Sequence, residues 1–163
     1  MPTVGGEPMT VPQQRDPGAV WLSLAHRSPD TVWTEWAAAT YAILPAGRLW
    51  DVVTVPLPTL TSAMQRDRAS WARVPILRDL GTERGYVWVP SGTAATWPQG
   101  QRGTRALGSP WWVAVPHPSG PQVPERRWLR APDAAPALMS PTALRAVLGI
   151  TKTPPRPRRG WSA

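Results

Sequence analysis

The chain has 163 residues, a formal net charge of +8 and no cysteine. The lack of cysteine excludes a disulfide framework, a thiolate metal site and a cysteine nucleophile. Two histidines, His26 and His117, are too few to supply the nitrogen or sulfur ligands of a zinc site.

The positive charge is concentrated at the C-terminus. Half of the net charge lies in residues 152–163, which contain no acid and hold Lys152, Arg156, Arg158 and Arg159. This Pro/Arg-rich tail is predicted to be extended and to contact nucleic-acid phosphates without reading sequence. Its P-x-x-P pattern is also typical of a ligand for a protein partner.

Composition along the chain predicts three parts. Residues 1–17 are rich in Pro and Gly and are expected to form a flexible arm. Residues 18–150 are predicted to form one α+β domain, and residues 151–163 form the basic tail. No apolar run is long enough to span a bilayer, and the first residues do not resemble a secretory signal, so we expect a cytoplasmic protein without membrane contact.

The first elements follow from local signals. Asp16 and Pro17 have the pattern of an N-cap followed by Pro at the first helical position, which predicts a helix to about Arg27. Residues 31–36 fit either a strand or a second short helix.

Two apolar runs then fit strands. Residues 38–44 and 49–55 flank a Pro-Ala-Gly-Arg turn, so we expect them to pair as a hairpin. Asp51 and Thr54 lie three residues apart in the second run and are therefore expected on opposite faces of that strand.

The middle of the chain gives five further elements. In order, we expect a helix over 57–68, an edge strand over 74–78, a strand over 86–89 that pairs with it, a short helix or turn over 91–95, and a long loop over 97–110.

The last elements are two strands and a helix. Residues 111–115 and 126–130 are predicted to pair with each other, and a final helix is expected to begin at Ser140 and end at Gly149. The sum is an α+β fold: a mostly antiparallel sheet of about six strands, covered on one side by three or four short helices.

One loop mixes basic and aromatic side chains. Arg102, Arg105 and Trp111 form a pattern that is typical of single-strand binding by charge and stacking. The alternative is that the tryptophans are core residues and the arginines are solvated. Because neighbours on a strand face opposite sides, at least one of Trp111 and Trp112 is expected in the core.

No motif indicates catalysis. The acidic residues are scattered singly, without the close pairs that hold Mg²⁺ in two-metal phosphoryl transfer, so we expect no metal and no cofactor. Asp51 is expected either to face solvent or to cap a neighbouring backbone donor. The alternative is that it is the relic of an active site.

Four segments carry a resemblance to a known family. LPAGRLWDVVTVP, ILRDLGTERGYVWVPSGTAATW, GSPWWVAVPHP and RRWLRAP, within about residues 20–149, resemble small actinobacterial proteins similar to the N-terminal domain of bifunctional DNA primase–polymerases. The resemblance implies a primase–polymerase or RRM-like fold. Active members use a D-x-D pair on a strand and a later His, whereas here Asp51 is followed by Thr54 where a second acid is wanted.

The resemblance therefore implies a degenerate site at Asp51 and Thr54. We expect a non-catalytic, DNA-associated accessory protein linked to plasmid replication, transfer or spread by conjugation. The first alternative is a protein-interaction module that acts through a Trp-rich surface and the tail. The second is a residual nucleotide-binding or nucleotidyl-transfer enzyme.

Overall fold

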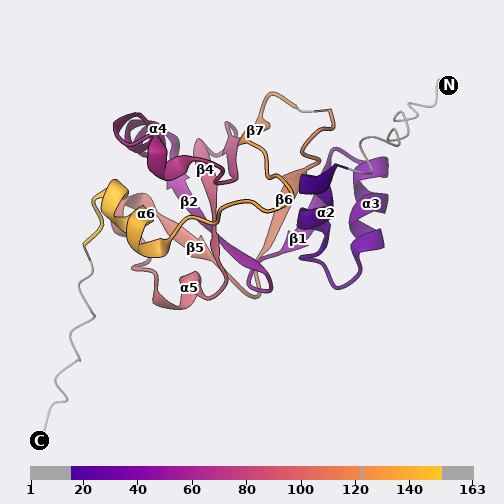
Figure 1. The fold of residues 1–163 in the computed structure, drawn as a ribbon, viewed down its shortest axis with the longest axis horizontal. Coiled ribbons are helices and arrows are strands. Elements are labelled where there is room, and N and C mark those ends of the chain that lie inside the picture. The colour runs from indigo at the N-terminus through magenta and orange to yellow at the C-terminus, as the bar shows by residue number, and fades with distance from the viewer. Residues whose placement is uncertain (1–15, 122, 152–163) are drawn as a thin grey trace, which may run out of the picture.

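A computed structural model describes residues 16–121 and 123–151. These residues form an α+β fold with five α-helices and seven strands, and the strands make two antiparallel sheets (Figure 1). In chain order the elements are α2 (Pro17–Ser23), α3 (Pro29–Ala38), β1 (Tyr41–Pro45), β2 (Trp50–Pro56), α4 (Leu57–Arg66), β3 (Ile76–Asp79), β4 (Arg84–Pro90), α5 (Thr93–Thr96), β5 (Arg105–Leu107), β6 (Trp112–Pro116), β7 (Arg126–Arg130) and α6 (Pro141–Leu148). The predicted α+β class is confirmed, and the primase–polymerase or RRM-like likeness stays a prediction.

The larger sheet has the strand order β5-β2-β4-β3-β7, and β1 pairs with β6 in the smaller one. Strand β2 lies inside the larger sheet, between β5 and β4. Every residue from Trp50 to Val55 is buried, because both faces of this strand are covered. A strand covered on both faces has a continuous apolar run rather than an alternating one.

The two faces of the larger sheet pack against different elements. On one face, Val53 and Val55 contact the apolar sides of α4 and α6, represented by Leu60 and Leu144. Figure 1 shows these two helices together at the left of the molecule.

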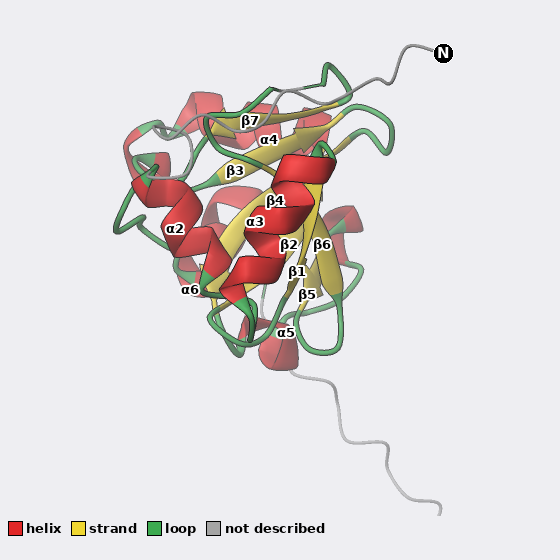
Figure 2. Cartoon of the chain, turned by 90° about the vertical axis from the view of Figure 1, so that its right-hand side faces the viewer, coloured by secondary structure: helices red, strands yellow, loops and turns green. Residues whose placement is uncertain are grey.

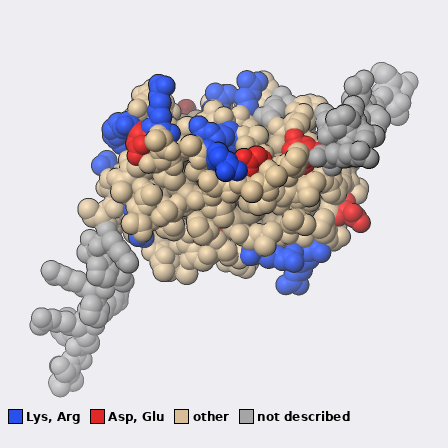
Figure 3. Space-filling model, viewed as in Figure 1, with Lys and Arg blue, Asp and Glu red and all other residues tan. Residues whose placement is uncertain are grey.

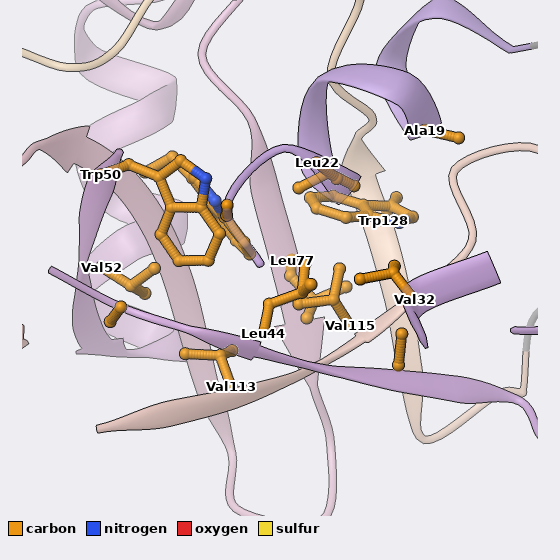
Figure 4. Packing of buried hydrophobic residues seen from close by; sticks show 14 of the residues in the cluster. Ala19, Leu22, Val32, Leu44, Trp50, Val52, Leu77, Val113, Val115 and Trp128 are labelled. Carbon is orange, nitrogen blue, oxygen red and sulfur yellow. The ribbon is translucent and has the colours of Figure 1, made fainter. Parts of the chain in front are cut away.

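The opposite face packs on the smaller sheet and on the first two helices. Trp50 and Val52 on this face belong to the same core as Leu44 of β1 and Val115 of β6, and Figure 4 shows these side chains close together. Helices α2 and α3 lie beyond the smaller sheet, in front of the strands in Figure 2. No helix in the described ranges is long and apolar enough to cross a membrane.

Local signals located two predicted N-caps and the C-terminal end of α6, whereas α2 ends at Ser23 and not at about Arg27 as expected. Asp16 accepts a hydrogen bond from Ala19 N at 3.0 Å, and Ser140 accepts one from Ala143 N at 3.4 Å, so both predicted N-caps are confirmed. Gly149 caps α6 at a φ of +69°. Residues 31–36, which fitted either a strand or a helix, lie in α3.

Of the three predicted strand pairings, one is confirmed and two are wrong. The hairpin of β3 and β4 is confirmed. The expected hairpin of 38–44 with 49–55 is wrong, because β1 pairs with β6 and β2 enters the other sheet. The expected pairing of 111–115 with 126–130 is also wrong, because β7 pairs with β3.

Two further expectations need correction. Strand β3 is not at an edge, since β4 and β7 flank it and Pro75 precedes its first residue. The expected loop over 97–110 contains the edge strand β5, which is only three residues long and gives too little sequence pattern to recognise.

Candidate functional site

Asp51 lies on the helix face of β2 and is 1% exposed. Its Oδ2 accepts a hydrogen bond from the backbone N–H of Ala94 at 2.8 Å, which agrees with the expectation that it caps a neighbouring backbone donor. Burial raises the pKa of the Asp51 carboxyl above its ordinary value of 3.8, and the hydrogen bond from Ala94 opposes this shift. The expected exposure to solvent is wrong, because α5 covers this end of the strand.

Thr54 points to the opposite face of β2, as predicted. Its hydroxyl accepts a hydrogen bond from Arg84 Nη2 at 2.9 Å, and its carbonyl accepts another at 3.0 Å from the same nitrogen. Asp51 and Thr54 therefore do not share a site. Among residues 16–121 and 123–151, no group of three or more His, Asp or Glu side chains is placed to hold a metal ion.

Trp111 and Arg105 come together at the surface. The Arg105 guanidinium carbon lies 4.6 Å from the centre of the Trp111 ring, within the range of a cation–π contact. The Trp111 side chain is 47% exposed, so the ring remains accessible beside the arginine.

Trp112 is also exposed, at 55%. Its ring lies 6.0 Å from the ring of His26. The expectation that Trp111 or Trp112 enters the core is wrong. Strand β6 begins at Trp112, so alternation does not apply to Trp111, and Trp112 faces away from the core on the outer side of the smaller sheet.

Two hollows meet at Trp111. The first, which we call the turn hollow, has a volume of about 420 Å³ and is lined by His26, Arg27, Pro45, Ala46, Gly47, Arg48, Ser109, Pro110, Trp111 and Trp112. The second, which we call the edge groove, has a volume of about 770 Å³, follows β5, and is lined by Thr54, Arg84, Gln99, Gly100, Gly103, Thr104, Arg105, Ala106, Leu107 and Trp111.

The two hollows are basic. Together their linings contain four arginines (Arg27, Arg48, Arg84 and Arg105) and, among the residues that the structure describes, no Asp or Glu. None of these arginines takes part in a salt bridge within the described part of the chain. Figure 3 shows basic side chains in separate groups on this view of the molecule rather than as one continuous face.

Backbone contacts hold the walls of the turn hollow in place. Ala46 N donates to the Trp111 carbonyl at 2.9 Å, and Gly47 N donates to the Trp50 carbonyl at 2.8 Å. Gly47 has a φ of +96°, and a Cβ at this position would collide with the backbone of Ser109. The β1–β2 turn therefore packs directly against the segment that leads to Trp111.

The other sequence-predicted binding residues lie elsewhere. The Arg102 guanidinium lies against the C-terminal end of α6, where a Cβ on Gly149 would be 2.9 Å from its Nη2. Arg102 is therefore apart from Arg105 and Trp111. Lys152, Arg156, Arg158 and Arg159 lie outside the described residues.

Sequence reasoning did not select Arg27, Arg48 or Arg84 for this site. Arg27 follows α2, Arg48 lies in the β1–β2 turn, and Arg84 begins β4, so only the tertiary fold brings them near Trp111. A possible signal was Arg48, because it directly follows a turn glycine in an otherwise apolar region.

Comparison with known proteins found no match: no family model fits the sequence, and searches of curated proteins and of solved structures found no similar protein.

Proposed function

We propose that this chain is a non-catalytic, primase–polymerase-like accessory protein that associates with DNA, in the context of plasmid replication or transfer. The context rests on the family resemblance alone. The observation that supports DNA association is the exposed Trp111 ring with the Arg105 guanidinium 4.6 Å from its centre, between two arginine-lined hollows.

The position of Asp51 supports the non-catalytic part of the proposal. A carboxylate that holds a catalytic metal ion must face a space that the ion and its substrate can enter. Asp51 is 1% exposed, and one of its oxygens accepts the Ala94 N–H. Thr54, where the resemblance wants a second acid, points to the other face of the strand and is bound by Arg84.

The chemistry of the surface supports DNA as partner. Arginine side chains neutralise phosphates and release counterions, which supplies affinity without sequence preference. Exposed aromatic rings add stacking on bases, worth about 1–3 kcal/mol per base when measured by alanine substitution. Both contributions are available at Trp111 and the adjacent arginines.

The test is DNA binding as a function of salt, measured with the full chain and with a variant that lacks residues 152–163. We expect both to bind, with affinity falling as salt rises, and the shortened variant to show a smaller slope of log K against log salt. Binding that disappears with the tail would assign it to the tail alone, and no binding by the full chain would refute the proposal.

Two other experimental outcomes would replace the proposed function with one of the alternatives. Mn²⁺-dependent nucleotide incorporation that Asp51→Ala abolishes would identify an enzyme. Failure to bind DNA, together with saturable binding of a protein partner that Trp111→Ala and Trp112→Ala weaken, would favour the interaction module, since the same exposed rings suit a protein contact.

A further inference from the structure

The turn hollow has the features of a small ligand site. Its volume of about 420 Å³ falls within the roughly 300–1,000 Å³ that small-molecule sites occupy. Trp111 and Trp112 supply two exposed aromatic rings, and Arg27 and Arg48 in its lining supply positive charge. Its charge is therefore complementary to an anionic ligand that also presents a flat ring.

We propose that the turn hollow binds one unpaired nucleobase of a single-stranded DNA, and that the strand continues past Trp111 into the edge groove. This inference rests on the DNA association proposed above and goes beyond it by assigning the strand state and the site of base contact. Trp111 lines both hollows, so a chain of nucleotides that leaves one enters the other at this ring.

The exposed rings favour a single strand over a duplex. In a duplex the bases are stacked on one another, and a protein reaches only their edges in the grooves and the phosphates. Trp111 and Trp112 are 47% and 55% exposed and offer ring surface on which an unstacked base, but not a base inside a duplex, can stack. The arginines line the same hollows, so they can contact the phosphates on either side of such a base.

The hollow is organised before any ligand binds. The hydrogen bonds from Ala46 N to Trp111 O and from Trp111 N to Gly108 O, at 2.9 and 2.8 Å, fix the backbone on both sides of the ring. A site with fixed walls loses less conformational entropy on binding than a flexible loop does.

Hydrogen bonds also fix the walls of the edge groove. Arg84 donates from Nη2 to Thr54 and to the carbonyl of Gly103, so its guanidinium is held between β2 and the segment before β5. Arg105, on β5, is exposed and lies over Trp111. Phosphates that follow the bound base would therefore meet positive charge along the groove.

The experiment compares three DNA probes with the full-length chain by fluorescence anisotropy. The probes are an oligothymidine of roughly twelve nucleotides, within the site sizes of single-strand binders, an abasic strand of the same length, and a duplex of the same length. The abasic strand keeps the phosphates and lacks the bases, so contacts of the basic tail contribute equally to both single strands. We expect oligothymidine to bind more tightly than the abasic strand and the duplex.

The variants locate the contact. We expect Trp111→Ala and Trp112→Ala each to weaken oligothymidine binding by about 5- to 150-fold, the range that loss of one stacked base gives, and to leave binding of the abasic strand unchanged. Trp112→Phe should retain most of the affinity, whereas Trp112→Leu, which keeps apolar surface without an aromatic ring, should lose it. Leu129→Ala is the matched control, because Leu129 is 46% exposed on β7 and lines neither hollow.

The outcomes separate this inference from the proposed function. Equal affinity for oligothymidine and the abasic strand, or equal effects of Trp112→Phe and Trp112→Leu, would overturn the base site and leave DNA association standing. Binding of none of the three probes would refute DNA association itself. Tight duplex binding that both Trp→Ala variants retain would overturn only the single-strand assignment.

Discussion

The tryptophans of the central core and those of the turn hollow are the same residue type in opposite environments. Trp50 and Trp88 are fully buried, with ring centres 5.4 Å apart, and Trp88 lies 5.1 Å from Trp128. Trp111 and Trp112 are about half exposed. Abundance of tryptophan therefore says little about function in this chain. Whether a ring lies on a covered face of a sheet decides whether it remains available for binding, since Trp50 and Trp112 both begin a strand and only Trp50 is buried.

The largest expected effect comes from removing a buried ring. Trp88→Ala leaves a cavity between Trp50 and Trp128, and we expect it to lower the free energy of unfolding by about 3–5 kcal/mol. The measurement is urea denaturation. Trp112→Ala is the control and should change stability by less than about 0.5 kcal/mol, because its side chain is exposed. Similar losses for the two variants would break the distinction between the two sets of rings.

The next largest effect concerns the β1–β2 turn, which packs against the segment that leads to Trp111 and Trp112. Gly47→Ala and Gly92→Ala both place a side chain on a backbone with positive φ, which costs about 1–2 kcal/mol for an L-residue. The Cβ at position 47 collides with the Ser109 backbone, whereas no atom of the residues that the structure describes lies within 4 Å of a Cβ at Gly92. We expect the first variant to be less stable in thermal denaturation and to bind oligothymidine more weakly. Equal stability and binding would show that the close approach is unimportant.

Asp51 lies directly behind the segment that carries Trp111. Its Oδ2 is 3.2 Å from the position of a Cβ on Gly108, and Gly108 accepts the hydrogen bond of Trp111 N. Because burial raises its folded pKa above 3.8, the carboxyl binds a proton more readily in the folded state. Its contribution to stability is therefore present at low pH and is lost as the pH rises through the folded pKa.

The corresponding test measures the free energy of unfolding of the wild type and of Asp51→Asn at pH values on both sides of about 4 and takes the difference between them. We expect the wild type to lose stability relative to Asp51→Asn as the pH rises from about 4, by at most about 1.4 kcal/mol per pH unit. Asp67→Asn is the control. The hydroxyl of Ser70 holds the pKa of the Asp67 carboxyl below its ordinary value. The difference for Asp67→Asn should therefore move in favour of the wild type, and it should do so as the pH rises toward about 4 rather than above it. A difference between the wild type and Asp51→Asn that does not change with pH would contradict the effect of burial on the Asp51 pKa.

The smallest effect is on the salt dependence of DNA binding. Loss of one phosphate contact in Arg48→Gln should reduce the slope of log K against log salt by about 0.7, the value per contact for single strands. Arg127→Gln removes an exposed charge from β7, away from both hollows, and should leave the slope unchanged. Identical slopes for the two variants would exclude Arg48 from the phosphate path.

Local signals in the sequence predicted the parts of the fold that depend on neighbouring residues. The N-caps at Asp16 and Ser140 and the hairpin of β3 and β4 involve residues close in sequence. The partners of β1 and β7 did not follow from such signals, because they are set by which apolar faces the fold covers. The unbroken burial of β2 shows that its apolar run belonged to an interior strand and not to an outer hairpin.

The candidate site was predictable to a similar extent. Arg105 and Trp111 were selected by residue type, and the fold brings them into contact. Arg102 was selected on the same grounds, but its backbone turns at a φ of +55° and its guanidinium lies against α6. Arg27 and Arg48 reach the turn hollow only because β1 and β6 pair, and no local pattern indicates that pairing.

The outer strands of the larger sheet affect how copies of the chain meet in solution. The exposed edge of a sheet presents unpaired backbone groups to other chains, and short length and charged side chains hinder such pairing. Strand β5 has three residues and begins with Arg105, and three of the five residues of β7 are arginine. The arginines of these two strands thus oppose edge-to-edge aggregation whether or not DNA is present. Added salt screens this repulsion along with the attraction for phosphates, so conditions that release DNA also remove a barrier to self-association.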